Sequence, residues 1–109
     1  MLTLITSNPQ KAEQIQLLLS VPLTHQAIDL PEIQSDDVEE IARDKASCAY
    51  QIVDAPIIVE DTALTFHALG KLPGPYIKWF LDNIGSIGLC KLLAEFEDRR
   101  ATATTCVVY

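Results

Sequence analysis

The chain has 109 residues, which fits one domain spanning residues 1–109, and 49% of them are hydrophobic. Its formal net charge of −7 argues against nucleic acid as a partner, because a phosphate backbone selects clustered lysine and arginine. No stretch reaches the ~20 apolar residues of a membrane span, the first residues lack a signal-peptide pattern, and three scattered cysteines indicate reduced thiols. We therefore expect an acidic, cytoplasmic domain that binds neither nucleic acid nor membranes.

Strand-like and helix-like segments alternate along the chain, and local signals set their boundaries. Asn8 suits a helix N-cap and Pro9 the first helical position, while Asp37 with Glu40 makes a second capping pattern. The expected elements, in chain order, are a strand at 2–6, a helix at 9–20, a strand at 23–28, a helix at 37–53, a strand at 56–59, helices at 77–83 and 87–96, and a strand at 101–109. This alternation predicts an α/β fold with a mixed, partly parallel sheet flanked by helices.

Two lysines occupy positions that helix formation alone does not explain. Lys11 would lie in the first turn of its helix, where the helix dipole disfavours a cation unless an anion such as phosphate sits there. Lys45 lies on the apolar stripe of its helix, four residues after Ile41 and four before Ala49. The functional interpretation directs both ammonium groups to bound negative charge. The alternatives are a solvated Lys11 and a Lys45 ammonium that reaches past the apolar surface to water.

An acid pair, Glu60 and Asp61, follows the buried strand predicted at 56–59. In open α/β sheets, ligands bind at the carboxyl ends of the strands. With Glu32 from the preceding loop, the pair could hold Mg²⁺ through oxygen ligands while phosphates complete its shell. Because successive strand residues point to opposite faces, only one of the two acids needs to face the site. The alternative is a strand-end turn in which Asp61 caps the next segment.

The segment LPGPYIKWF, residues 72–80, contains two prolines that restrict the backbone and a glycine that permits an unusual dihedral angle. Such a turn could aim Lys78 at a phosphate while Trp79 and Phe80 line the wall of the site. Core packing is the favoured alternative for these two aromatic residues. Lysines and carboxylates clustered near turns together indicate a phosphate-binding α/β domain that uses Mg²⁺.

These residues stand in motifs that resemble those of the inosine triphosphate pyrophosphatase (Ham1-like) family. The matching motifs are TSNPQK at 6–11, LPE at 30–32, VEDTAL at 59–64, ALGKLPGPYIKWF at 68–80 and FEDRRA at 96–101. Members of that family usually continue for several tens of residues, into a portion that reads the purine base. The resemblance therefore implies the fold of that family without its C-terminal portion, with the strand at 101–109 left at an exposed edge.

The resemblance implies Mg²⁺-dependent hydrolysis of ITP, dITP and XTP to the nucleoside monophosphate and pyrophosphate, by a homodimer. It implies that Glu32 and Asp61 hold the metal and that Asp61 accepts the proton of the attacking water. The residues that it implies for substrate binding are Thr6, Ser7, Asn8, Lys11, Lys45, Thr62 and Lys78. The alternative function is a module that binds triphosphates with little or no turnover, or that pairs with a full-length subunit.

Overall fold

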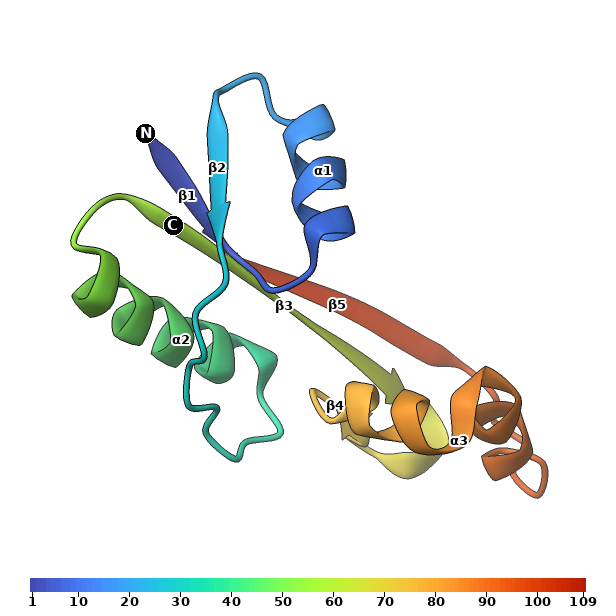
Figure 1. Cartoon of the computed structure of the whole chain (residues 1–109). Helices are drawn as coiled ribbons and strands as arrows, with labels where there is room; N and C mark the ends of the chain where they lie inside the picture. The colour runs from blue at the N-terminus through green and yellow to red at the C-terminus, as the bar shows by residue number, and fades with distance from the viewer.

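A computed structural model describes residues 1–109 as two lobes joined by a long two-stranded ribbon (Figure 1). One lobe holds α1, α2 and the parallel strands, and the other holds α3 and β4. The elements are β1 Leu2–Ile5, α1 Pro9–Leu18, β2 Leu23–Gln26, α2 Val38–Val53, β3 Ile57–Phe66, a 3-10 turn His67–Leu69, β4 Pro73–Gly74, α3 Ile77–Leu92 and β5 Ala101–Val108. None of the helices has the length and apolar character needed to cross a membrane.

The sheet is parallel in the first lobe and antiparallel in the second. Strand β1 pairs in parallel with β2 on one side and with the start of β3 on the other. Strand β3 then pairs antiparallel with β4 and, over eight residue pairs, with β5. The predicted mixed, partly parallel sheet flanked by helices is therefore confirmed. Strand β5 pairs with β3 alone, so its outer edge has no neighbouring strand, as the sequence led us to expect.

Strand β3 is much longer than the sequence indicated. We predicted a strand ending at Val59, with the acid pair directly after it and a strand-end turn as the alternative, but β3 continues to Phe66. The continuation is held by pairing with β5, which runs from Val59 opposite Val108 to Phe66 opposite Ala101. The prediction that the acids lie at the end of the strand was wrong. The strand is extended by pairing with β5, which is distant in the sequence, and no local signal indicates this pairing. The acids lie instead where the pairing of β3 with β1 stops, after Ile58.

The helix boundaries follow the local signals. Asn8 caps α1 by accepting backbone N–H groups, and Asp37 caps α2 in the same way. The two helices predicted at 77–83 and 87–96 are two segments of α3, which is interrupted at Gly85 by a non-helical backbone conformation with φ 66° and ψ 179°. The second segment ends at Leu92, short of the predicted boundary.

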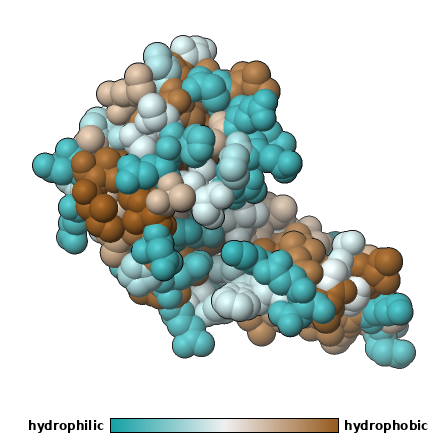
Figure 2. Space-filling view, viewed as in Figure 1, coloured by the Kyte–Doolittle hydropathy of each residue, from teal (hydrophilic) through white to brown (hydrophobic).

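Each lobe has its own small core. The first is formed by Ala46 and Ala49 of α2 against the start of β3, and the second by Phe66 with Ile77, Leu89 and Leu93. The molecule measures 49 × 27 × 21 Å, and its radius of gyration of 15.6 Å exceeds the roughly 13 Å of a compact domain of this length. Its accessible surface of 7389 Å² likewise exceeds the roughly 6,000 Å² expected for its mass. Figure 2 shows that the surface is hollowed between the two lobes.

Candidate functional site

A cavity of about 640 Å³ lies between the lobes, and all nine residues that the resemblance assigned to the metal and the substrate line it. It is within the size range of ligand pockets in proteins. The structure brings together nine residues from six segments of the chain: Thr6, Ser7, Asn8, Lys11, Glu32, Lys45, Asp61, Thr62 and Lys78. The roles that we assigned to them individually stay predictions, and their convergence is an observation.

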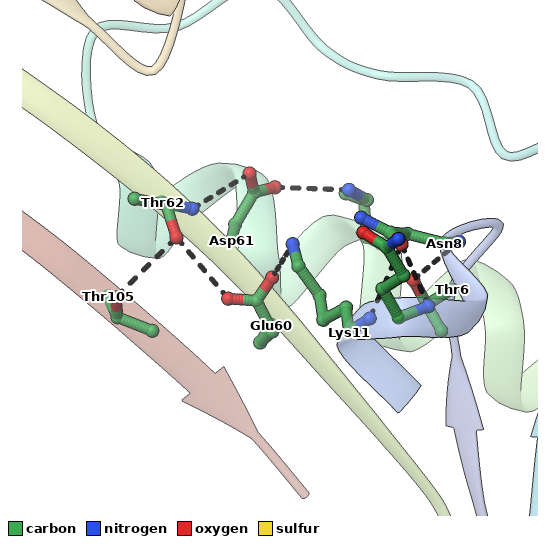
Figure 3. Close-up of polar contacts among 9 residues, drawn as sticks. Thr6, Asn8, Lys11, Glu60, Asp61, Thr62 and Thr105 are labelled. Carbon is green, nitrogen blue, oxygen red and sulfur yellow. Dashed lines mark hydrogen bonds and ion pairs between the residues drawn. The ribbon is translucent and has the colours of Figure 1, made fainter. Parts of the chain in front are cut away.

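The turn from β1 into α1 forms one end of the cavity. The Asn8 side-chain oxygen accepts the backbone N–H groups of Gln10 at 3.0 Å and Lys11 at 3.3 Å. The Asn8 backbone N–H in turn donates to the Thr6 hydroxyl at 3.1 Å, which fixes the turn around Ser7 (Figure 3). The amino end of α1 thereby faces the cavity with the partial positive charge that favours an anion.

Lys11 does not turn away to solvent. Its ammonium donates to the Glu60 carboxylate, forming an ion pair between α1 and β3 (Figure 3). The Glu60 side chain is only 11% exposed, and a carboxylate taken that far out of water requires a cationic or hydrogen-bonding partner. The solvated alternative for Lys11 is therefore not the arrangement in the structure.

Lys45 forms a second ion pair, with Asp61. The Lys45 ammonium lies 3.1 Å from an Asp61 carboxylate oxygen, and the two side chains are 25% and 14% exposed. The neighbours of Lys45 on the helix stripe, Ile41 and Ala49, are buried. The ammonium consequently leaves the apolar contact between α2 and β3 and enters the cavity rather than bulk water.

Both acids of the pair reach the cavity, although we expected that only one would need to. Glu60 contacts a lysine of α1, whereas Asp61 contacts a lysine of α2. Glu60 also accepts a hydrogen bond from the Thr62 hydroxyl at 3.3 Å, two residues along the same face of β3. Thr62 is within 3.5 Å of the Thr105 hydroxyl of β5 (Figure 3). Sequence analysis placed Glu60 in the acid pair that could hold Mg²⁺ but did not predict its ion pair with Lys11.

Glu32 and Lys78 face the cavity without a partner. Glu32 belongs to the segment between β2 and α2, and Lys78 is the second residue of α3. Both residues are exposed, and neither side chain makes a hydrogen bond or an ion pair. The PGP turn that precedes Lys78 depends on Gly74, whose φ is +57°. A side chain does not fit at this position, because an added Cβ would lie 2.7 Å from a backbone oxygen. The prediction that the glycine of this turn adopts an unusual dihedral angle is therefore confirmed.

The two aromatic residues after Lys78 behave differently from each other. Phe80 packs against the core of the second lobe, as expected. Trp79 is 68% exposed and lines the cavity, so the expectation that it would be a core residue was wrong. In α3, Phe80 lies three residues after buried Ile77 and shares its face, while Trp79 is rotated about 100° away from Phe80.

The charge of the cavity bears on which ligand it can hold. Its lining contains three lysines and five carboxylates, a formal net charge of −2; the carboxylates are Asp29, Glu32, Glu60, Asp61 and Asp82. No group of three or more histidine, cysteine, aspartate or glutamate side chains is placed to hold a metal ion by itself. The oxygen donors present nevertheless fit Mg²⁺, which is commonly held by one or two carboxylates together with substrate phosphates and water.

Residues 2–109 match the model of the Ham1 family. The chain is 53% identical over 109 residues to inosine triphosphate pyrophosphatase 2 of Trypanosoma cruzi, covering 98% of this chain and 56% of that protein. It is 48% identical over 101 residues to inosine triphosphate pyrophosphatase of Ajellomyces capsulatus, with 91% and 55% covered. The chain thus spans just over half the length of these curated relatives.

The fold is shared with a solved structure of the same family. The Staphylococcus aureus Ham1 protein aligns with a TM-score of 0.75 at 22% sequence identity, covering 97% of this chain and 60% of that one. At this identity, the comparison shows the fold and not the activity. The family-model match over nearly every residue, the curated relatives and this fold agree with one another. The chain belongs to the Ham1 family.

Proposed function

We propose that this chain binds the magnesium complex of a non-standard purine nucleoside triphosphate (ITP, dITP or XTP) and takes part in its hydrolysis to the monophosphate and pyrophosphate. The observation that supports this most strongly is the convergence of Lys11, Lys45 and Lys78 with Asp61 in one cavity. The relatives named inosine triphosphate pyrophosphatase support the choice of substrate. Hydrolysis between the α- and β-phosphates needs charge stabilisation more than covalent participation by the protein.

The ion pairs of the free cavity would be exchanged when substrate binds. In the free cavity, Lys11 and Lys45 are paired with carboxylates. When substrate binds, both ammonium groups can pair with phosphate oxygens instead, because these oxygens carry more charge. Lys78 is already free to add a third cation. The amino end of α1, with Thr6, Ser7 and Asn8, supplies backbone and side-chain groups for the same phosphates. The pairs thus keep the lysines in position until the substrate arrives.

Carboxylates of the cavity would hold the metal, among them Asp61 once the exchange frees it from Lys45. Glu32 and Asp61 are the proposed Mg²⁺ ligands, and Glu60 is a further donor within the same cavity. When bound, Mg²⁺ would offset the negative charge of the phosphates and of the acids. A cavity with a net charge of −2 repels a bare polyanion, so the proposal includes a requirement for the divalent cation.

Asp61 is proposed to orient the attacking water and accept its proton. Its second carboxylate oxygen accepts the Thr62 backbone N–H at 3.2 Å, which fixes the orientation of the group. Water attacks the α-phosphorus and pyrophosphate departs, while the lysines stabilise the charge on both sets of oxygens. Thr62 contacts the nucleotide in this proposal.

The test is pyrophosphate release from ITP in the presence of Mg²⁺. Asp61→Asn should lower release by about 100-fold or more, since general-base catalysis contributes roughly 10²–10⁴-fold. Asp44→Asn provides the matched control: it removes an acid of α2 that is outside the cavity and should leave release unchanged. Equal release from all three proteins, or an activity indifferent to EDTA, would contradict the proposal.

A second candidate function, favoured by the exposed surface, is a subunit-pairing module. The accessible surface exceeds that of a compact chain by roughly 1,400 Å², more than the ~800 Å² that one partner buries in a standard interface. The outer edge of β5, ATATTCVV, carries no charge or proline to block strand addition. We propose that two chains associate through this edge. Light scattering should then show a dimer that Val107→Lys converts to monomer, and a wild-type monomer at millimolar concentration would rule it out.

A further inference from the structure

Lys11 already has an anion beside it in the free protein. The sequence predicted an anion near this lysine, because the helix dipole disfavours a cation in the first turn of a helix. The structure supplies that anion from within the chain: the Glu60 carboxylate of β3 accepts a hydrogen bond from the Lys11 ammonium (Figure 3). Any phosphate that binds at Lys11 therefore meets a carboxylate that is already there.

The Glu60 carboxylate depends on Lys11 to offset its charge. Its side chain is 11% exposed, and its other oxygen accepts a hydrogen bond from the Thr62 hydroxyl at 3.3 Å. That hydroxyl is neutral and also lies within 3.5 Å of the Thr105 hydroxyl, so it does not replace an ammonium group (Figure 3). A carboxylate largely removed from water is costly without a cationic partner. Glu60 thus opposes the loss or sharing of Lys11.

We propose that Glu60 is an internal competitor of the phosphate chain and so selects the magnesium complex of the substrate over the metal-free polyanion. The inference rests on the proposed function and deepens it by assigning this selection to one residue. A phosphate at Lys11 either takes the ammonium group from Glu60 or shares it, and in both cases two anions are left with one cation. The charges are balanced again when the substrate arrives with a divalent cation.

This competition differs from the general negative charge of the cavity. Asp29 and Asp82 also line the cavity, but both are exposed and neither is paired with a lysine. Their charges act on a ligand through water and salt, which screen exposed charges over about 8 Å at physiological ionic strength. Asp61, the acid of the second ion pair, is also the proposed base. Glu60 is therefore the acid at which the selection can be separated from the proposed proton transfer.

Calorimetry with a ligand that cannot be cleaved measures the selection. The probe is inosine triphosphate with a methylene group between the α- and β-phosphates, titrated in Mg²⁺ and, separately, in EDTA. We expect wild-type protein to bind it more tightly in Mg²⁺. Glu60→Gln should strengthen binding in EDTA by about 10-fold or more, because the phosphate chain then takes Lys11 from a neutral amide. The ratio of the two affinities should fall by a similar factor.

Asp82→Asn is the matched control, because it removes one negative charge from the same cavity without releasing a lysine. It should change binding in EDTA by less than about 3-fold. Glu60→Ala, which leaves no amide to hold Lys11, should behave as Glu60→Gln does. In a Lys11→Met background, Glu60→Gln should strengthen binding in EDTA by less than about 3-fold, since the competition acts through Lys11.

Two results would overturn the inference and leave the proposed function in place. Weaker binding by Glu60→Gln in both Mg²⁺ and EDTA would mean that Glu60 only positions Lys11. Unchanged binding in EDTA, or a gain no larger than that of Asp82→Asn, would mean that the carboxylate does not compete with phosphate. Failure of the proposed function is distinguishable, because wild-type protein would then not bind the probe even in Mg²⁺.

Discussion

The ion pair between Lys45 and Asp61 permits a quantitative test of the site. At 3.1 Å, two unit charges attract by about 5 kcal/mol for an effective dielectric constant near 20. Much of that attraction only offsets the cost of removing both groups from water. Breaking an ion pair costs ~0–1 kcal/mol of stability at the surface and ~3–5 kcal/mol in the interior, and this pair lies between the two cases. With side chains 25% and 14% exposed, we expect Lys45→Met to cost about 2 kcal/mol, since it leaves Asp61 without its partner.

Urea unfolding measures this cost. A loss of about 2 kcal/mol lowers the urea midpoint by roughly 1 M at the slopes typical of small domains. The double variant Lys45→Met with Asp61→Asn should recover part of the loss, because no charge is then left unpaired. Arg43→Met is the control on the same helix: Arg43 pairs with Glu39 at the exposed surface, and its removal should not measurably move the midpoint. A Lys45→Met midpoint equal to that of the control would refute the reasoning.

Three further predictions concern the turns that hold the site and the pH dependence of stability. Asn8→Ala should cost about 1 kcal/mol of stability in urea unfolding and weaken tripolyphosphate binding, because it removes the cap of α1. Gly74→Ala should destabilise the protein more than Gly70→Ala, since both positions have positive φ but only at Gly74 would the new methyl group meet a backbone oxygen, at 2.7 Å; equal unfolding midpoints would count against this. The Arg100 side chain, and then its backbone N–H, holds the pKa of Asp98 well below its usual value of 3.8. Because the folded pKa is the lower one, the stability from this pair is present above about pH 4 and is lost as pH falls below it, so Asp98→Asn should flatten the acid limb of a stability profile.

The sequence by itself determined the features that depend on a few neighbouring residues. Asn8 and Pro9 specified where α1 begins, because a cap is a hydrogen bond to N–H groups two and three residues away. The apolar spacing of α2 put Lys45 on the buried side of its helix, and the PGP turn predicted a backbone that only glycine tolerates. These signals were enough to choose the fold class and to nominate residues that the cavity brings together, but they did not indicate the pairing of Glu60 with Lys11 or the presence of Asp29 and Asp82 in the lining.

Only the tertiary structure decided what those residues meet. Lys11 and Glu60 are 49 residues apart, and nothing local to either one specifies the other as its partner. Strand β3 extends past the acids because β5 pairs with it, and Trp79 faces the cavity because Ile77 and Phe80 take the core side of α3. Each of these outcomes follows from packing between segments that come together only in the folded chain. Short-range propensities contain no information about such contacts, which is why the sequence supplied the site's residues and the fold supplied its pairings.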